Sequence, residues 1–145
     1  MDKGKIRAED FREAFAKRQR EGGKVFKWVQ SDYFVDAQKR RYGVTWSCEH
    51  SGTWFLNLLE GEFDLAVLLC EVRPGVATIL LLPNGFVNRY WHSFSRDKNG
   101  EMKFNVIKKS GRFHLQIPQP VGLVDVSDFV SPELLEAPER PEVFF

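Results

Sequence analysis

The spacing of apolar residues predicts an N-terminal helix followed by a series of strands. Between residues 7 and 21 four apolar residues recur at helical spacing, namely Ala8, Phe11, Ala14 and Phe15. Acidic residues in the first turn and Gly22-Gly23 at the end agree with the start and the stop of a helix. We therefore expect a helix over residues 7–21.

The segment that follows alternates between apolar and polar residues and is rich in Val, Phe, Tyr and Trp, which is typical of strands. The pattern predicts strands over 24–30, 33–38 and 44–49. The period of two places Asp36 on the polar face of its strand, and Ser47 and Glu49 together on the polar face of the next.

Two almost continuous apolar runs, 63–72 and 76–83, are joined by the turn-forming sequence Arg73-Pro74-Gly75. We expect them to be the central strands of a sheet, buried on both faces. The apolar segment 53–61 that precedes them fits either a short helical turn or an irregular packed segment.

The last third of the chain predicts a short amphipathic helix over 86–94 and a hairpin of 102–109 with 112–118 around Ser110-Gly111. A helix start is expected at Ser131-Pro132-Glu133, before a mobile tail rich in Pro and Glu. The elements predict an α/β (α+β) fold with a single mixed sheet of five to six strands, flanked by the N-terminal helix and the second short helix. We expect one domain over 1–130, followed by the helix start and tail in 131–145.

Composition narrows the functional classes. The 145 residues are enough for one core, and a net charge of +1 gives no global attraction to nucleic acid or to an anionic membrane. Cys48 and Cys70 lie within apolar or alternating runs and do not form a short-spaced pair, so we expect free thiols in a reducing compartment. The N-terminus lacks the apolar core of a signal peptide and every apolar run is strand-sized, so we expect a cytoplasmic protein without membrane contact.

Phosphate-binding glycine loops, the GxSxG elbow and the HExxH motif are absent from the sequence. The order of elements, with Asp36 on one strand and Ser47-Cys48-Glu49 on the next, resembles the PD-(D/E)XK (restriction-endonuclease-like) nuclease superfamily. The resemblance implies a restriction-endonuclease-like core and Mg²⁺-dependent phosphodiester hydrolysis, because carboxylate oxygens suit this hard cation.

On this resemblance, Asp36 and Glu49 are the expected metal ligands, and Ser47 and Glu13 are further catalytic candidates. The sequence departs from the family pattern, since Ser47 stands where an acid is usual and Glu49 where a lysine is usual. A degenerate fold that binds nucleic acid without cleaving it is therefore an open alternative, and so is the simple interpretation that these acids are solvated surface charges.

Two groups of basic residues are candidates for contacts with DNA or RNA phosphates. The first is Lys39, Arg40 and Arg41, and the second is Lys108, Lys109 and Arg112. Both lie at predicted turns, where charged residues also collect for solubility alone.

A different functional class is a non-enzymatic protein-interaction module, which would use an aromatic sheet face or the C-terminal tail that ends in Phe144-Phe145. The sequence leaves the substrate, the strand preference and the oligomeric state open.

Overall fold

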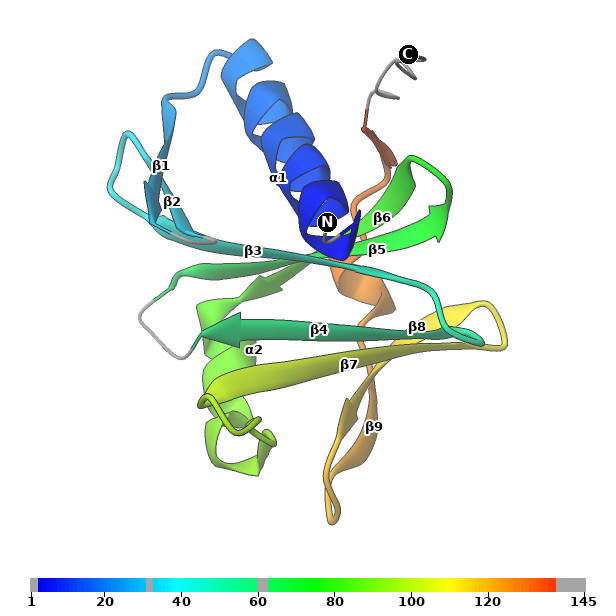
Figure 1. The fold of residues 1–145 in the computed structure, drawn as a ribbon. Helices are drawn as coiled ribbons and strands as arrows, with labels where there is room; N and C mark the ends of the chain where they lie inside the picture. Colours follow the sequence, from blue (N-terminus) through cyan, green and yellow to red (C-terminus); the bar gives the residue numbers. More distant parts are fainter. Residues whose placement is uncertain (1–2, 31–32, 60–62, 138–145) are drawn as a thin grey trace.

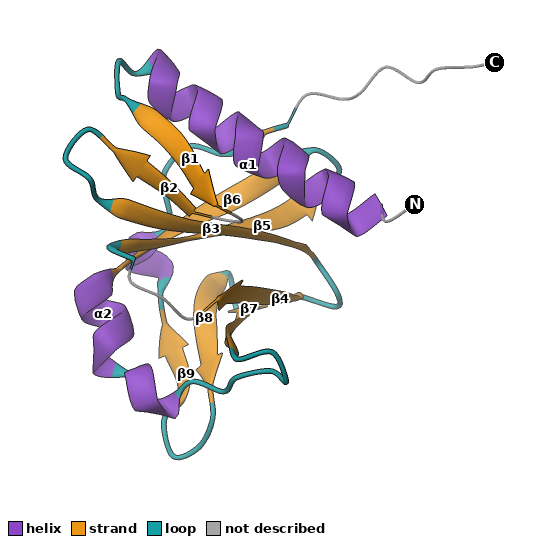
Figure 2. Cartoon of the chain, turned by 60° about the vertical axis from the view of Figure 1, so that its left-hand side comes forward, coloured by secondary structure: helices purple, strands orange, loops and turns teal. Residues whose placement is uncertain are grey.

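The chain folds into three layers, with a long helix on one side of a larger β-sheet and a smaller β-sheet on the other side (Figures 1 and 2). This arrangement comes from a computed structural model that describes residues 3–30, 33–59 and 63–137. The N-terminal helix, α1 (Lys3–Glu21), includes the range expected from the apolar spacing.

The larger sheet has six strands. In spatial order they are β1 (Phe26–Gln30), β2 (Tyr33–Asp36), β3 (Arg41–Cys48), β5 (Leu65–Arg73), β6 (Val76–Pro83) and β10 (Leu135–Glu136). Neighbouring strands are antiparallel except for β3 and β5, which pair in parallel.

The smaller sheet has four antiparallel strands, and it faces the larger sheet. In spatial order they are β4 (Thr53–Leu59), β7 (Glu101–Lys109), β8 (Arg112–Ile117) and β9 (Gly122–Asp125). The helix α2 (Asn84–Arg89) and a 3₁₀ turn (Trp91–Ser93) follow β6 and pack beside the space between the sheets, and a second 3₁₀ turn (Ser127–Phe129) follows β9.

Two apolar clusters cover the two faces of the larger sheet. Phe11 and Phe15 of α1 pack on one face with Leu69 of β5. Leu68 of β5 points to the other face, where it packs with Trp54 of β4 between the sheets. Because β5 is buried on both faces, and β6 runs beside it, the expectation that 63–72 and 76–83 are central strands is confirmed.

The expected number of sheets is wrong, because the strands divide between two sheets, and a restriction-endonuclease-like core is not confirmed. The ambiguous segment 53–61 contains strand β4. Its inward residues Trp54, Leu56 and Leu58 alternate with outward ones, but the outward position of the apolar Phe55 hides the period of two in the sequence. The hairpin of 102–109 with 112–118 is confirmed as β7 and β8.

The prediction of a helix start at Ser131-Pro132-Glu133 is also wrong. The chain runs on into β10, where Leu135 is buried against the α1 side of the larger sheet and the Ala137 N–H donates to the Gly75 carbonyl at 2.8 Å. Backbone pairing and burial therefore carry the domain past residue 130, as far as residue 137. The tail expected to be mobile lies, from residue 138, outside the described residues.

In the part of the chain that the structure describes, no helix combines the length and the apolar character needed to cross a membrane.

Replacing Leu69 with Ala should lower the free energy of unfolding by about 2–5 kcal/mol, because this side chain is fully buried in the centre of the sheet and its removal leaves a cavity. The matched control is Leu134→Ala, at a leucine that is 43% exposed, and it should change stability by no more than about 0.5 kcal/mol. Urea unfolding of both variants measures the difference. Equal effects at the two positions would contradict the central place of β5.

Candidate functional site

Asp36 closes the turn between β2 and β3. Its side chain is buried and accepts four hydrogen bonds: the backbone N–H groups of Gln38 and Arg40 donate to Oδ1 at 3.0 and 2.9 Å, while Arg40 Nε and the Tyr42 hydroxyl donate to Oδ2 at 2.8 and 2.9 Å. All of these donors belong to the turn or to the start of β3. The carboxylate is therefore occupied by the fold.

The charged form of Asp36 is favoured by these partners. Burial alone would raise the pKa of the carboxyl group, but the hydrogen bonds from Arg40 and Tyr42, with the positive charge of Arg40, outweigh it and hold the pKa below its ordinary value. Burial and the bond to Asp36 raise the pKa of Tyr42, which therefore stays a neutral donor at physiological pH.

Glu49 lies far from Asp36. Asp36 bonds to the turn just before β3, whereas Glu49 directly follows the last residue of β3 and is exposed. Eight residues of extended strand separate the two positions by about 25 Å. The structure therefore does not bring Asp36 and Glu49 together as ligands of one metal ion.

The other two catalytic candidates are also apart. Ser47 is buried and its hydroxyl donates to the Cys48 carbonyl at 3.1 Å. Glu13 is exposed on α1 and accepts from Arg20 at 3.1 Å. Across the described ranges, no three or more His, Cys, Asp or Glu side chains gather as a metal site.

The two basic groups lie at opposite ends of β3 and do not form one surface (Figure 1). At the β2–β3 turn, where Lys39 has a positive φ, Arg40 pairs with Asp36 and the Arg41 guanidinium lies 5.0 Å from the centre of the Tyr33 ring. The β7–β8 turn is tied to the far end of β3, since the Lys108 N–H donates to the Gly52 carbonyl.

The second basic group is only partly available to a ligand. Lys108 lies over the Phe113 ring, and Lys109 is exposed. Arg112 Nε donates to Asp125 Oδ2 at 2.5 Å, and this bond, followed by one from the Ser127 backbone, holds the pKa of Asp125 well below its usual range.

A cavity of about 300 Å³ lies between the start of α1 and the ends of β3 and β5. Arg7, Cys48, Glu49, Glu71 and Arg73 are among the residues that line it. Arg7 forms an ion pair with the largely buried Glu71, which also accepts the Gly75 N–H at 2.8 Å. This pair attaches α1 to the sheet, so two of the charged residues that line the cavity already have a structural role.

The outer face of the smaller sheet carries a different set of side chains. The strand register aligns one residue from each strand, in the order Phe55, Asn105, Gln116 and Leu123. Phe55 is 56% exposed and Leu123 is 43% exposed. Their neighbours toward the core, such as Leu56 and Leu115, are fully buried, so the sheet is amphipathic. The row of four residues that crosses its outer face carries no charge.

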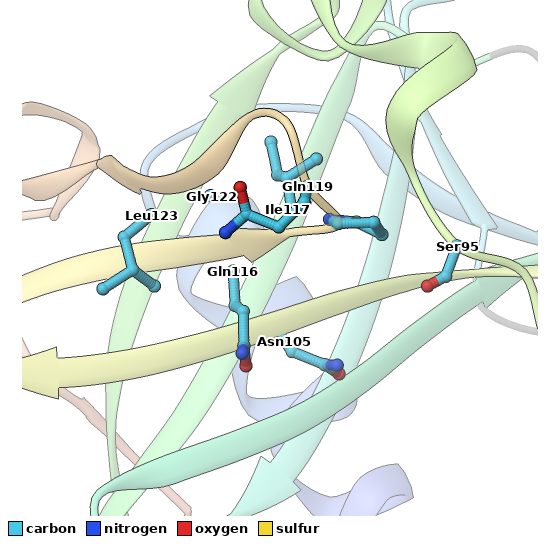
Figure 3. A pocket seen from close by; sticks show the side chains of 8 residues that line it. Ser95, Asn105, Gln116, Ile117, Gln119, Gly122 and Leu123 are labelled. Atoms are coloured by element: carbon cyan, nitrogen blue, oxygen red, sulfur yellow. The ribbon is translucent and has the colours of Figure 1, made fainter.

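A cavity of about 350 Å³ lies along this row (Figure 3). Figure 3 shows the Asn105 and Gln116 side chains next to each other on β7 and β8, with Leu123 continuing the row and Ser95 at the other end. Its lining contains no charged residue, and consists of Ser95, Asn105, Gln116, Ile117, Pro118, Gln119, Gly122 and Leu123.

The polar groups of this cavity lack partners in the fold. Within the described part of the chain, no hydrogen bond involves the side chains of Ser95, Asn105, Gln116 or Gln119. Three carboxamides and a hydroxyl thus present both donors and acceptors to solvent. Charged groups stand at the margin, where Arg112 pairs with Asp125.

None of these residues was a candidate predicted from the sequence. Alternation in 102–109 and 112–117 was a usable signal, because it places Asn105 and Gln116 on the face opposite the buried Phe104 and Leu115. It could not show that Phe55 and Leu123 extend the same row, because this depends on how β4 and β9 pair.

Replacing Asp36 with Asn should destabilise the protein by about 1–3 kcal/mol. The buried side chain loses its ion pair with Arg40, and the backbone N–H groups of Gln38 and Arg40 then face a neutral amide in place of the carboxylate. A lowered pKa in the folded state stabilises the protein above the unfolded value of about 4. The difference from wild type should therefore be full above about pH 5 and shrink as the pH falls toward the lowered pKa.

Thermal unfolding at pH 3 to 7 measures this difference. Glu49→Gln is the matched control and should leave stability unchanged at each pH, since Glu49 is exposed. A variant of Asp36 as stable as wild type at pH 7 would contradict the structural role of this carboxylate.

Comparison with known proteins adds no relative: no family model, no curated protein and no solved structure matches the chain.

Proposed function

We propose that the chain is a non-enzymatic protein-interaction module whose contact surface is the outer face of the smaller sheet. The observation that carries the proposal is the uncharged row of Phe55, Asn105, Gln116 and Leu123, which crosses all four strands. Protein interfaces have such a pattern, with aromatic and uncharged groups in the centre and charged groups at the rim.

Exposure of the row supports this function. An exposed phenylalanine and an exposed leucine at the two ends gain from removal of water, and the carboxamides between them gain hydrogen bonds that the fold does not supply.

The competing proposal is a nucleic-acid-binding domain, with or without Mg²⁺-dependent cleavage. It has less support, because Arg40 and Arg112 are engaged by Asp36 and Asp125 and the two basic groups are at opposite ends of β3. Phosphate binding needs several available positive charges on one surface.

A photoreactive phenylalanine analogue at position 55 tests the proposed contact. In cells that produce the protein, cross-links to a polypeptide should form at position 55 and should be lost when Leu123→Lys adds a charge to the same row. The control is the analogue at position 29, since Val29 is similarly exposed but lies on β1 of the other sheet.

Fluorescence anisotropy with labelled DNA and RNA oligonucleotides tests the competing proposal. We expect no binding at 150 mM salt, since a net charge of +1 with paired arginines provides little counterion release. Binding that weakens steeply with salt and is lost in Lys108→Ala with Lys109→Ala, together with the absence of polypeptide cross-links, would overturn the interaction module.

A further inference from the structure

We infer that the occupant of this face is a second copy of the chain, packed face to face about a two-fold axis parallel to the strands of the smaller sheet. The inference rests on the proposed function, because it names the partner of the same surface. It follows from the order of the side chains along the row and from their hydrogen-bonding chemistry.

The order of the row makes it self-complementary. A two-fold axis along the middle of a four-stranded sheet places β4 of one copy over β9 of the other, and β7 over β8. Phe55 then faces Leu123 of the second copy, and Asn105 faces its Gln116. Each contact occurs twice, which is the property of an isologous interface.

The next row obeys the same symmetry. Its residues are Thr53, Ile107, His114 and Asp125, in strand order. The axis sets the Thr53 hydroxyl against the Asp125 carboxylate of the second copy, and Ile107 against its His114. No pair of like charges meets in either of these two rows. In the row beyond them the axis sets Lys109 of one copy against Arg112 of the other, where Arg112 is already paired with Asp125.

The carboxamides suit this partner. An amide side chain both donates and accepts, so Asn105 and Gln116 of one copy can satisfy Gln116 and Asn105 of the other. The cavity beside them would receive these groups, and its uncharged lining excludes a partner that presents an unpaired charge at its centre.

The area of the face limits how tightly two copies can bind. Four strands with spacings of about 4.8 Å, and the three outward residues Thr53, Phe55 and Asn57 along β4, span an area of roughly 15 by 20 Å per copy. Both copies together then cover roughly 600 Å², well below the about 1,200–2,000 Å² of stable specific interfaces, so a weak and reversible dimer is expected. We expect a dissociation constant on the order of 100 μM.

Sedimentation equilibrium from about 10 μM to 1 mM measures the association. Wild type should dimerise reversibly, and Phe55→Lys or Leu123→Asp should each weaken the dimer by about tenfold or more, because each sets a charge against an apolar side chain. Val29→Lys, on the exposed edge strand of the other sheet, should dimerise like wild type.

An equal mixture of the Phe55→Lys and Leu123→Asp proteins makes the test specific to the two-fold pairing. In the mixed dimer one contact joins the new ammonium to the new carboxylate, and the other keeps Phe55 against Leu123. The mixture should therefore associate more tightly than either variant alone, and by more than a mixture of Phe55→Lys with Val29→Lys.

Wild type that stays monomeric to 1 mM, or a mixture no tighter than its components, would overturn the inference. Cross-links from position 55 to a different polypeptide, with a monomeric wild type, would overturn the second copy as the occupant and leave the proposed function standing. Thermal unfolding of each variant confirms that it is folded before it is compared, and the wild-type measurement needs no variant.

Discussion

The parallel pairing of β3 with β5 is the constraint on which the remaining structure depends. Two parallel neighbours cannot be joined by a tight turn, so the chain must return from the end of β3 to the start of β5. It does so through β4, which leaves the larger sheet and begins the smaller one. The second layer therefore follows from the pairing, and β7, β8 and β9 complete the sheet that β4 begins.

Placing β4 in a second sheet also decides which surface is available for binding. One face of the larger sheet is covered by α1, and its other face is covered by the smaller sheet. The inner face of the smaller sheet is buried in the same core, which includes Trp54 and Phe104. In the described part of the chain the outer face of the smaller sheet remains open, and its central row is uncharged.

Three of the carboxylates hold parts of the fold together. Asp36 orders the β2–β3 turn, Glu71 holds α1 through Arg7, and Asp125 joins β9 to Arg112 of β8. Each of these carboxylates is occupied by its partners and is therefore not free to bind a cation. Among the described residues, the amides of the outer face have no such partners, which is why we assign binding to them rather than to the acids.

Local sequence patterns predict the local elements. The helical spacing of Phe11 and Phe15, the buried runs around Leu69 and Leu81, and the hairpin at Ser110-Gly111 depend on neighbours along the chain. Tertiary structure alone decided that there are two sheets, that Asp36 and Glu49 lie at opposite ends of β3, and that Phe55 and Leu123 share a row. Alternation reports which face a residue takes within its own strand, but it carries no information on which strands become neighbours, because pairing depends on contacts between segments distant in the sequence.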